Sequence, residues 1–244
     1  MRLDWRRAYY IARKDLQAYY LKPPLISWGL MLPLVFLLAF YLRNPEGISE
    51  VSPGLLGMTI LFSTTSMAAI VITFEKRIDA LERLLLAPLS LRTILLGKGL
   101  GAAFFGLAMG LIALIFIIFI FGLSVSYPFS LFVSLVLSCF TFSFLGILIS
   151  VGVREVFEAM TLANFFRFPM IFLCGVFIPL ASMPLSLQIV GYLLPLTYAV
   201  DAFRQSLLSE GGLLNRWIDI LLLAGYCLFF FGAAVAVFKK RNQE

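Results

Sequence analysis

Six apolar segments, each long enough to cross a lipid bilayer, dominate this sequence. A helix needs about 20 mostly apolar residues to span the hydrocarbon core of a membrane, whereas a soluble domain alternates apolar and polar residues over shorter distances. With 61% of its 244 residues apolar, the chain is predicted to be an all-α membrane protein. The predicted spans are Pro24–Leu42, Leu55–Phe74, Thr93–Leu123, Phe129–Val153, Ala159–Ile178 and Ile218–Phe238.

The basic residues predict how these spans are oriented. Of the 19 Lys and Arg residues, all except Arg43, Arg204 and Arg216 fall before the first span, after the last, or near the even-numbered connections. Excess positive charge marks the cytoplasmic face, so we expect both termini in the cytoplasm and the chain in the cell membrane. The net charge of +6 therefore reflects the orientation of the spans and is only weak evidence for binding to nucleic acid.

The first 22 residues predict an interfacial amphipathic helix, ahead of a six-span domain over residues 23–244. Its apolar positions recur at spacings of four and three, and most basic residues lie on the other side. These positions are Trp5, Tyr9, Ala12, Leu16 and Tyr19. Such a helix lies in the membrane interface. It could be a plain anchor or could dock a partner.

Catalytic and metal-binding signals are missing from the sequence. There is no histidine, and Cys139, Cys174 and Cys227 are far apart within apolar segments. Metal sites of the usual Cys/His kinds are therefore not expected. Gly97-Lys98-Gly99 is followed by leucine and does not form a phosphate-binding loop. The chain is not expected to be an enzyme or to hydrolyse ATP by itself.

The segment Phe74–Ser90 is the most informative interruption of the apolar pattern. Read as one helix, it carries an apolar stripe and a neighbouring acidic face: Ile78, Leu81 and Leu85 form the first, and Glu75, Asp79 and Glu82 the second. Asp79 and Arg83 form an i, i+4 pair that supports an exposed helix, and Pro88 ends it. The segment could press against a cytosolic partner, or be a solvated connecting helix.

A second interruption lies between the fifth and sixth spans, on the outer side. Pro179, Pro184 and Pro195 divide an apolar stretch into pieces too short to span a membrane. We therefore predict a pair of short re-entrant helices that dip into the outer leaflet. They could form a lid over an exit path or only fill space.

These two segments resemble signatures of the type-2 membrane permeases of ATP-binding-cassette (ABC) exporters. The charged helix is similar to a Phe-Glu…Leu-Glu-x-Leu-Leu…Pro-Leu-Ser segment, and the outer region to a Gly-x-x-x-Pro…Met-Pro…Pro-Leu-Thr-Tyr-x-x-Asp-x-x-Arg pattern. The sequence departs from the usual residues at Asp79-Ala80, which replace Gly-Thr, and at Cys174 and Leu194, which replace Ser and Asn. The resemblance covers essentially the whole chain.

The resemblance implies an exporter subunit that works as a dimer with an identical or paralogous permease. Separate ATPase subunits would bind ATP and Mg, and would dock on two cytoplasmic connections. The predicted coupling residues are Glu75, Lys76, Arg77, Asp79, Glu82, Arg83, Arg154, Glu155 and Glu158. The predicted outer gate comprises Pro179, Pro184, Pro195, Tyr198, Asp201 and Arg204. The expected cargo is an amphiphile, a drug, a lipid-linked molecule or a glycan.

Polar residues within the spans are few, so each is informative. By resemblance to relatives, Ser63, Ser66, Met67 and Asn164 would line the substrate pathway, although hydroxyls can equally bond to their own helix. Arg167 lies well inside a span and has no deep carboxylate to neutralise it. Such an arginine usually faces a cavity, a partner or an anionic headgroup, or else extends toward the cytoplasmic headgroups. We predict that Arg167 faces the subunit interface or an inward-open cavity and is the fifth residue of the pathway.

Small residues in the third span predict close helix packing. Gly97/Gly101 and Gly106/Gly110 are small-xxx-small pairs on roughly opposite faces.

Two other functions compete with the exporter. A membrane anchor or assembly subunit would need no pathway. A secondary transporter would show internal repeats and acidic residues at mid-membrane, and the sequence shows neither clearly.

Overall fold

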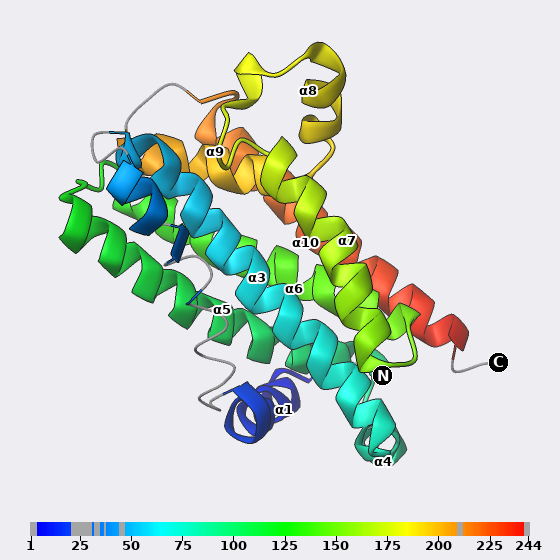
Figure 1. Ribbon diagram of the computed structural model, residues 1–244. Coiled ribbons are helices and arrows are strands. Elements are labelled where there is room, and N and C mark those ends of the chain that lie inside the picture. The colour runs from blue at the N-terminus through cyan, green and yellow to red at the C-terminus, as the bar shows by residue number, and fades with distance from the viewer. Residues whose placement is uncertain are drawn as a thin grey trace.

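In the computed structural model, residues 4–20, 31, 35–36, 38–43, 47–208 and 212–241 are described, and the regular structure among them is helical. Five of these helices are long and apolar enough to cross a membrane (Figure 1): α3 (Ile48–Arg77), α5 (Leu91–Phe121), α6 (Pro128–Gly152), α7 (Val156–Leu173) and α10 (Arg216–Arg241). They confirm the second to sixth predicted spans. The predicted first span, Pro24–Leu42, lies largely outside the described residues.

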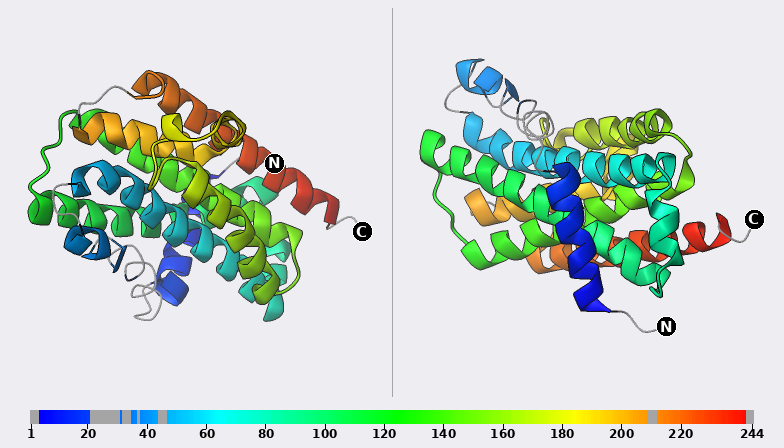
Figure 2. Two further views of the ribbon diagram at one scale, coloured as in Figure 1. Left: turned by 45° about the horizontal axis from the view of Figure 1, so that its top comes forward. Right: turned by 90° about the horizontal axis from the view of Figure 1, so that it is seen from below.

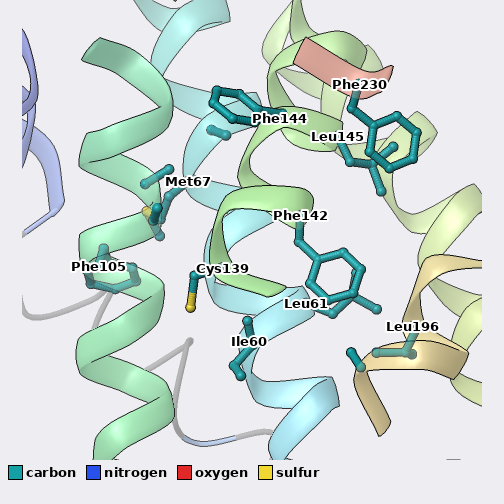
Figure 3. Close-up of a cluster of buried hydrophobic side chains, with 14 of the residues drawn as sticks. Ile60, Leu61, Met67, Phe105, Cys139, Phe142, Phe144, Leu145, Leu196 and Phe230 are labelled. Atoms are coloured by element: carbon teal, nitrogen blue, oxygen red, sulfur yellow. The ribbon is translucent and has the colours of Figure 1, made fainter. Parts of the chain in front are cut away.

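Helices α3 and α6 occupy the centre of the bundle, with α5 on one side and α7 and α10 on the other (Figure 1). The apolar parts of α3 and α6 are mostly buried, whereas most residues of α7 and α10 are only partly buried or exposed. Figure 3 shows Leu61 of α3, Phe142 of α6 and Leu196 of α9 in this core. Because lipid is as apolar as these side chains, close packing must hold the helices together.

Glycines of α5 make that close packing possible. A Cβ on Gly106 would lie 2.0 Å from Thr64 Cγ2 of α3, and one on Gly110 would lie 3.1 Å from Ile60 Cγ1 of the same helix. On another face of α5, a Cβ on Gly97 would lie 2.8 Å from the carbonyl oxygen of Ala8. The small residues of the third span therefore contact helices on two sides, as predicted.

The two ends of the bundle differ. One end, which we call the α4 end, carries α1 (Trp5–Asp15), its π-helical continuation Leu16–Tyr20, α4 (Ala80–Leu86) and the C-terminal end of α10. Figure 2 shows α1 lying across the spanning helices. The other end, the α8 end, carries the 3-10 turn Leu180–Ser182, α8 (Leu185–Tyr192) and α9 (Pro195–Leu208).

Helix α1 packs against α5 through a face that sequence periodicity predicted only in part. Ala8, Ile11, Ala12 and Asp15 are buried. Of the predicted apolar stripe, Ala12 is buried and Leu16 and Tyr19 pack against the core, whereas Trp5 and Tyr9 are 64% and 55% exposed. The N-terminal helix is therefore seated on the bundle, with aromatic residues left on its outer side.

The fifth span ends earlier than predicted, at Leu173 instead of Ile178. Gly175 adopts a positive φ of 77°, a conformation that residues with a Cβ atom disfavour. The chain turns there, before Pro179. The last residues of the apolar segment thus form the turn that leads into the α8 end.

Candidate functional site

The charged segment at the α4 end is two helices instead of one. Helix α3 continues to Arg77, Asp79 takes a left-handed conformation with φ of 55°, and α4 starts at Ala80. The prediction that Phe74–Ser90 contains a single helix is therefore wrong. Aspartate is one of the few residues that visit the left-handed region readily. Asp79 is the N-cap residue of α4, and its carbonyl oxygen accepts from the backbone amide of Arg83 at 3.3 Å.

Most of the predicted coupling residues are exposed together at this end. Buried Leu81 anchors α4. The connection between α6 and α7 lies close by, because Lys76 Nζ donates to the carbonyl oxygens of Ser150 (2.9 Å) and Val153 (3.3 Å). Glu158 Oε2 accepts from the backbone amides of Arg154 and Glu155, which closes a capping box at the start of α7. The exposed residues, which we call the α4-end surface, are Arg77, Asp79, Glu82, Arg83, Arg154, Glu155 and Glu158.

Two predicted coupling residues serve another purpose. Lys76 is partly buried and ties the end of α3 to the end of α6. The side chain of Glu75 is fully buried and lies between two lysines, with Oε1 2.6 Å from Lys14 Nζ and Oε2 bonded to Lys98 Nζ. Glu75 is therefore not available to a docking partner, and this part of the prediction is wrong.

Glu75 belongs to a buried group of four charges that joins α1, α3 and α5. We call Lys14, Asp15, Glu75 and Lys98 the four-charge cluster. Lys98 Nζ lies 2.9 Å from Asp15 Oδ2, and Lys14 Nζ lies 3.1 Å from Asp15 Oδ1. Asp15, Glu75 and Lys98 are at most 1% exposed. Burial raises the pKa of the Asp15 carboxyl, and Lys98 beside it opposes that rise.

The five residues predicted to line a pathway meet around one cavity of about 600 Å³ between α3 and α7. Its wall includes Ser63, Ser66, Met67, Asn164 and Arg167. The rest is aromatic and aliphatic, and includes Phe62, Met160 and Phe177. Ser63 Oγ bonds to the carbonyl oxygens of Thr59 and Ile60 in its own helix, so its hydroxyl is already used.

Arg167 points from α7 toward α3. Its side chain is 1% exposed, Nε donates to Thr65 Oγ1 at 2.6 Å, and Nη1 donates to Asn164 Oδ1 at 3.1 Å. The guanidinium carbon lies 5.1 Å from the centre of the Phe62 ring. The alternative in which Arg167 extends along lipid toward the headgroups is therefore wrong. Cation–π contact and hydrogen bonds to neutral groups hold it inside the protein.

At the α8 end the prolines act as predicted, since each starts a new element. Pro179 precedes the turn Leu180–Ser182, Pro184 precedes α8, and Pro195 is the first residue of α9. Helices α8 and α9 meet at an angle of 90°.

The other predicted outer-gate residues fasten α9 to its surroundings. Tyr198 Oη donates to the carbonyl oxygen of Tyr192 at 2.5 Å, and Arg204 Nη2 to that of Gly175 at 3.1 Å. Asp201 accepts from the backbone amide of Leu213 at 2.9 Å. These contacts fix α9 against the turn after α7 and the start of the segment that leads into α10.

Known proteins are similar to this chain in sequence. Residues 7–208 match the family described as ABC-2 type transporter. The chain is 29% identical to the putative transport permease ycf38 of Cyanophora paradoxa, over 75% of this chain and 68% of that protein. It is 27% identical to nodulation protein J of Bradyrhizobium diazoefficiens, over 97% and 92%. It is also 27% identical to the probable multidrug ABC transporter permease YbhS of Escherichia coli, over 86% and 56%. The chain therefore belongs to the ABC-2 type transporter family and is a membrane permease of that family.

Proposed function

We propose that this permease is the transmembrane subunit of an ATP-driven exporter in the cell membrane. It pairs with a second permease, identical or paralogous, and moves an amphiphilic, lipid-like, drug or glycan substrate outward. Separate ATPase subunits bind ATP and Mg and dock on the α4-end surface. Both termini lie in the cytoplasm, and surrounding lipids contact the exposed apolar faces.

The observation that carries this proposal is that one helix, α3, runs from the cavity to the α4-end surface. Ser63, Ser66 and Met67 of α3 line the cavity, and the same helix ends at Arg77 on the α4-end surface. From Ser66 to Arg77 the distance along the helix is about 16 Å, at 1.5 Å per residue. A movement imposed on the end of α3 therefore reaches the cavity wall through a rigid element.

The same observation separates the exporter from its alternatives. A membrane anchor or assembly subunit needs no cavity along a helix that ends at a docking surface. A secondary transporter driven by protons or cations would place acidic residues at its binding site. Among the described residues, the side chains around this cavity include no Asp or Glu.

Reversing two charges on α4 tests the docking role. In the double variant Glu82→Lys with Arg83→Glu, both changed side chains are exposed, so the fold should be retained. We expect the permease to insert in the membrane normally but to lose most of its co-purification with its ATPase, because complementary contacts become repulsive. Lys240→Glu, at the same end but outside the α4-end surface, is the control. Undiminished co-purification of the double variant would contradict ATPase docking on α4.

Cysteine labelling tests the proposed orientation. In a variant without native cysteines, Ser182→Cys at the α8 end should react with a membrane-impermeant thiol reagent added to intact cells. Asp79→Cys at the α4 end should react only after the cells are opened. Both positions are exposed, so burial does not limit the reaction. Labelling of both from outside would show that the proposed topology is wrong.

A further inference from the structure

We propose that the α3–α7 cavity binds an amphiphile with a negatively charged head, and that Arg167 holds the anion. This inference rests on the proposed function for its biological meaning, since it names the substrate class of the same cavity. Binding itself requires neither an ATPase nor transport, so it can be measured separately.

The charge of Arg167 is the first argument. Guanidinium stays protonated in proteins, and this one is buried in the middle of a spanning helix. Its described hydrogen-bond partners, Thr65 and Asn164, are neutral. A buried cation without a counter-ion is costly. An anion entering the cavity would supply the opposite charge that its described wall lacks.

The second argument is that donors remain free beside this charge. Arg167 Nη2 is buried and has no hydrogen-bond partner among the described residues. Nε and Nη1 are held by Thr65 and Asn164, so the guanidinium is fixed in place before a ligand arrives. Because Asn164 Oδ1 already accepts from Arg167, its amide nitrogen is the group left to donate to an anion.

Phe62 covers this charge and also lines the cavity. Its ring lies over the guanidinium, whose carbon is 5.1 Å from the ring centre. The anion would replace the cation–π contact with a charge-assisted hydrogen bond, which is the stronger interaction.

The remainder of the wall suits an apolar tail. Met58, Met67 and Met160 lie around the cavity with Ile171, Phe172 and Phe177. Methionine side chains adapt to ligands of different shape. A volume of about 600 Å³ is in the range of pockets that hold small organic ligands. One polar corner in an otherwise apolar cavity matches a molecule with one charged head and an apolar body.

Ligand binding to the purified full chain in a neutral detergent, measured by native mass spectrometry, tests the inference. The probes are dodecyl phosphate, dodecanol and dodecyltrimethylammonium, which share a tail and differ in charge. We expect dodecyl phosphate to bind at least roughly tenfold more tightly than the other two, as one charge-assisted hydrogen bond provides. Arg167→Gln should abolish this preference, and Arg167→Lys should keep part of it. Arg92→Gln, an exposed position on α5, is the matched control.

A wild-type chain without preference for the phosphate, or an Arg167→Gln variant that keeps it, would overturn the inference. Thermal stability of each variant shows whether it is folded, and Arg167→Lys tests the charge with the smallest change in shape. Parallel measurements with phosphatidylglycerol and phosphatidylcholine identify the source of the anion. A preference for phosphatidylglycerol points to a lipid headgroup, and a preference limited to dodecyl phosphate points to a single-chain ligand; either supports the site. Anion-selective binding without ATP-dependent transport would refute the proposed function and leave the binding site standing.

Discussion

Replacing Lys98 with methionine is expected to lower the free energy of unfolding by about 3–5 kcal/mol, the usual cost of removing one partner from a buried ion pair. Lys98 is 1% exposed and contacts both Asp15 and Glu75, whose side chains are fully buried. Without it, two carboxylates share Lys14, which is half exposed and approaches from the solvent side. Unfolding of the full chain in detergent micelles measures the effect.

Matched variants separate the loss of the ion pair from a general effect of mutation. Arg92→Gln changes an exposed cation of the same helix and should stay within about 0.5 kcal/mol of the wild type. Lys98→Met combined with Glu75→Leu leaves Asp15 paired with Lys14, so the double variant should be more stable than Lys98→Met alone. The single variant Glu75→Leu completes the comparison. If the double variant loses as much free energy of unfolding as Lys98→Met and Glu75→Leu lose together, these charges do not act together.

The four-charge cluster gives α1 a defined place in the proposed mechanism. Asp15 and Lys14 belong to α1, Lys98 to α5, and Glu75 lies two residues before the end of α3. Arg7 Nη1 also donates to the carbonyl oxygen of Pro88, just after α4, at 2.8 Å. Through these contacts, helix α1 is bonded to the end of α3, to the residues just after α4, and to α5. In the proposed exporter this keeps α4 from moving independently of the helices to which it must transmit force.

Hydropathy predicted the spans because lipid constrains every residue of a spanning helix in the same way. The prolines of the α8 end were equally informative, since proline ends a helix whatever surrounds it. Ser66 and Asn164 were assigned to a pathway by resemblance to related permeases, and Arg167 was singled out because a charged group in an apolar span needs a partner or a cavity. In the structure they lie on the wall of one cavity.

Local sequence patterns did not predict the contacts between segments that lie far apart in the sequence. Glu75 follows an apolar span and precedes a charged segment, and the sequence grouped it with that segment. Its actual partners, Lys14 and Lys98, lie 61 and 23 residues away. A signal was present, because Lys98 interrupts the third apolar span and Asp15 lies on the packed side of α1. Pairing them requires knowing that Gly97 lets α1 approach α5 at that level.

Gly54→Ala is expected to destabilise the protein by about 1–3 kcal/mol or more, as overpacking of a tight contact does. A Cβ at this position of α3 would lie 2.3 Å from the carbonyl oxygen of Val176 and 2.6 Å from its Cα. Both are backbone atoms, which cannot rotate away as a side chain can. Either α3 or the turn after α7 must shift to make room. Unfolding in detergent micelles measures the loss.

Gly225→Ala is the control, because a Cβ on this glycine of α10 would meet nothing within 4 Å, and alanine is the better helix former. We expect no loss of stability there. Val176 lies beside Gly175, whose carbonyl oxygen accepts from Arg204 of α9. A shift of this turn should therefore also loosen α9, and the buried native Cys174, which precedes Gly175, should react faster with thiol reagents in the Gly54→Ala background. If the two alanine variants are equally stable, the turn after α7 can move away from α3 without a cost in free energy. In that case movement of α3 could not reach the α8 end through this contact.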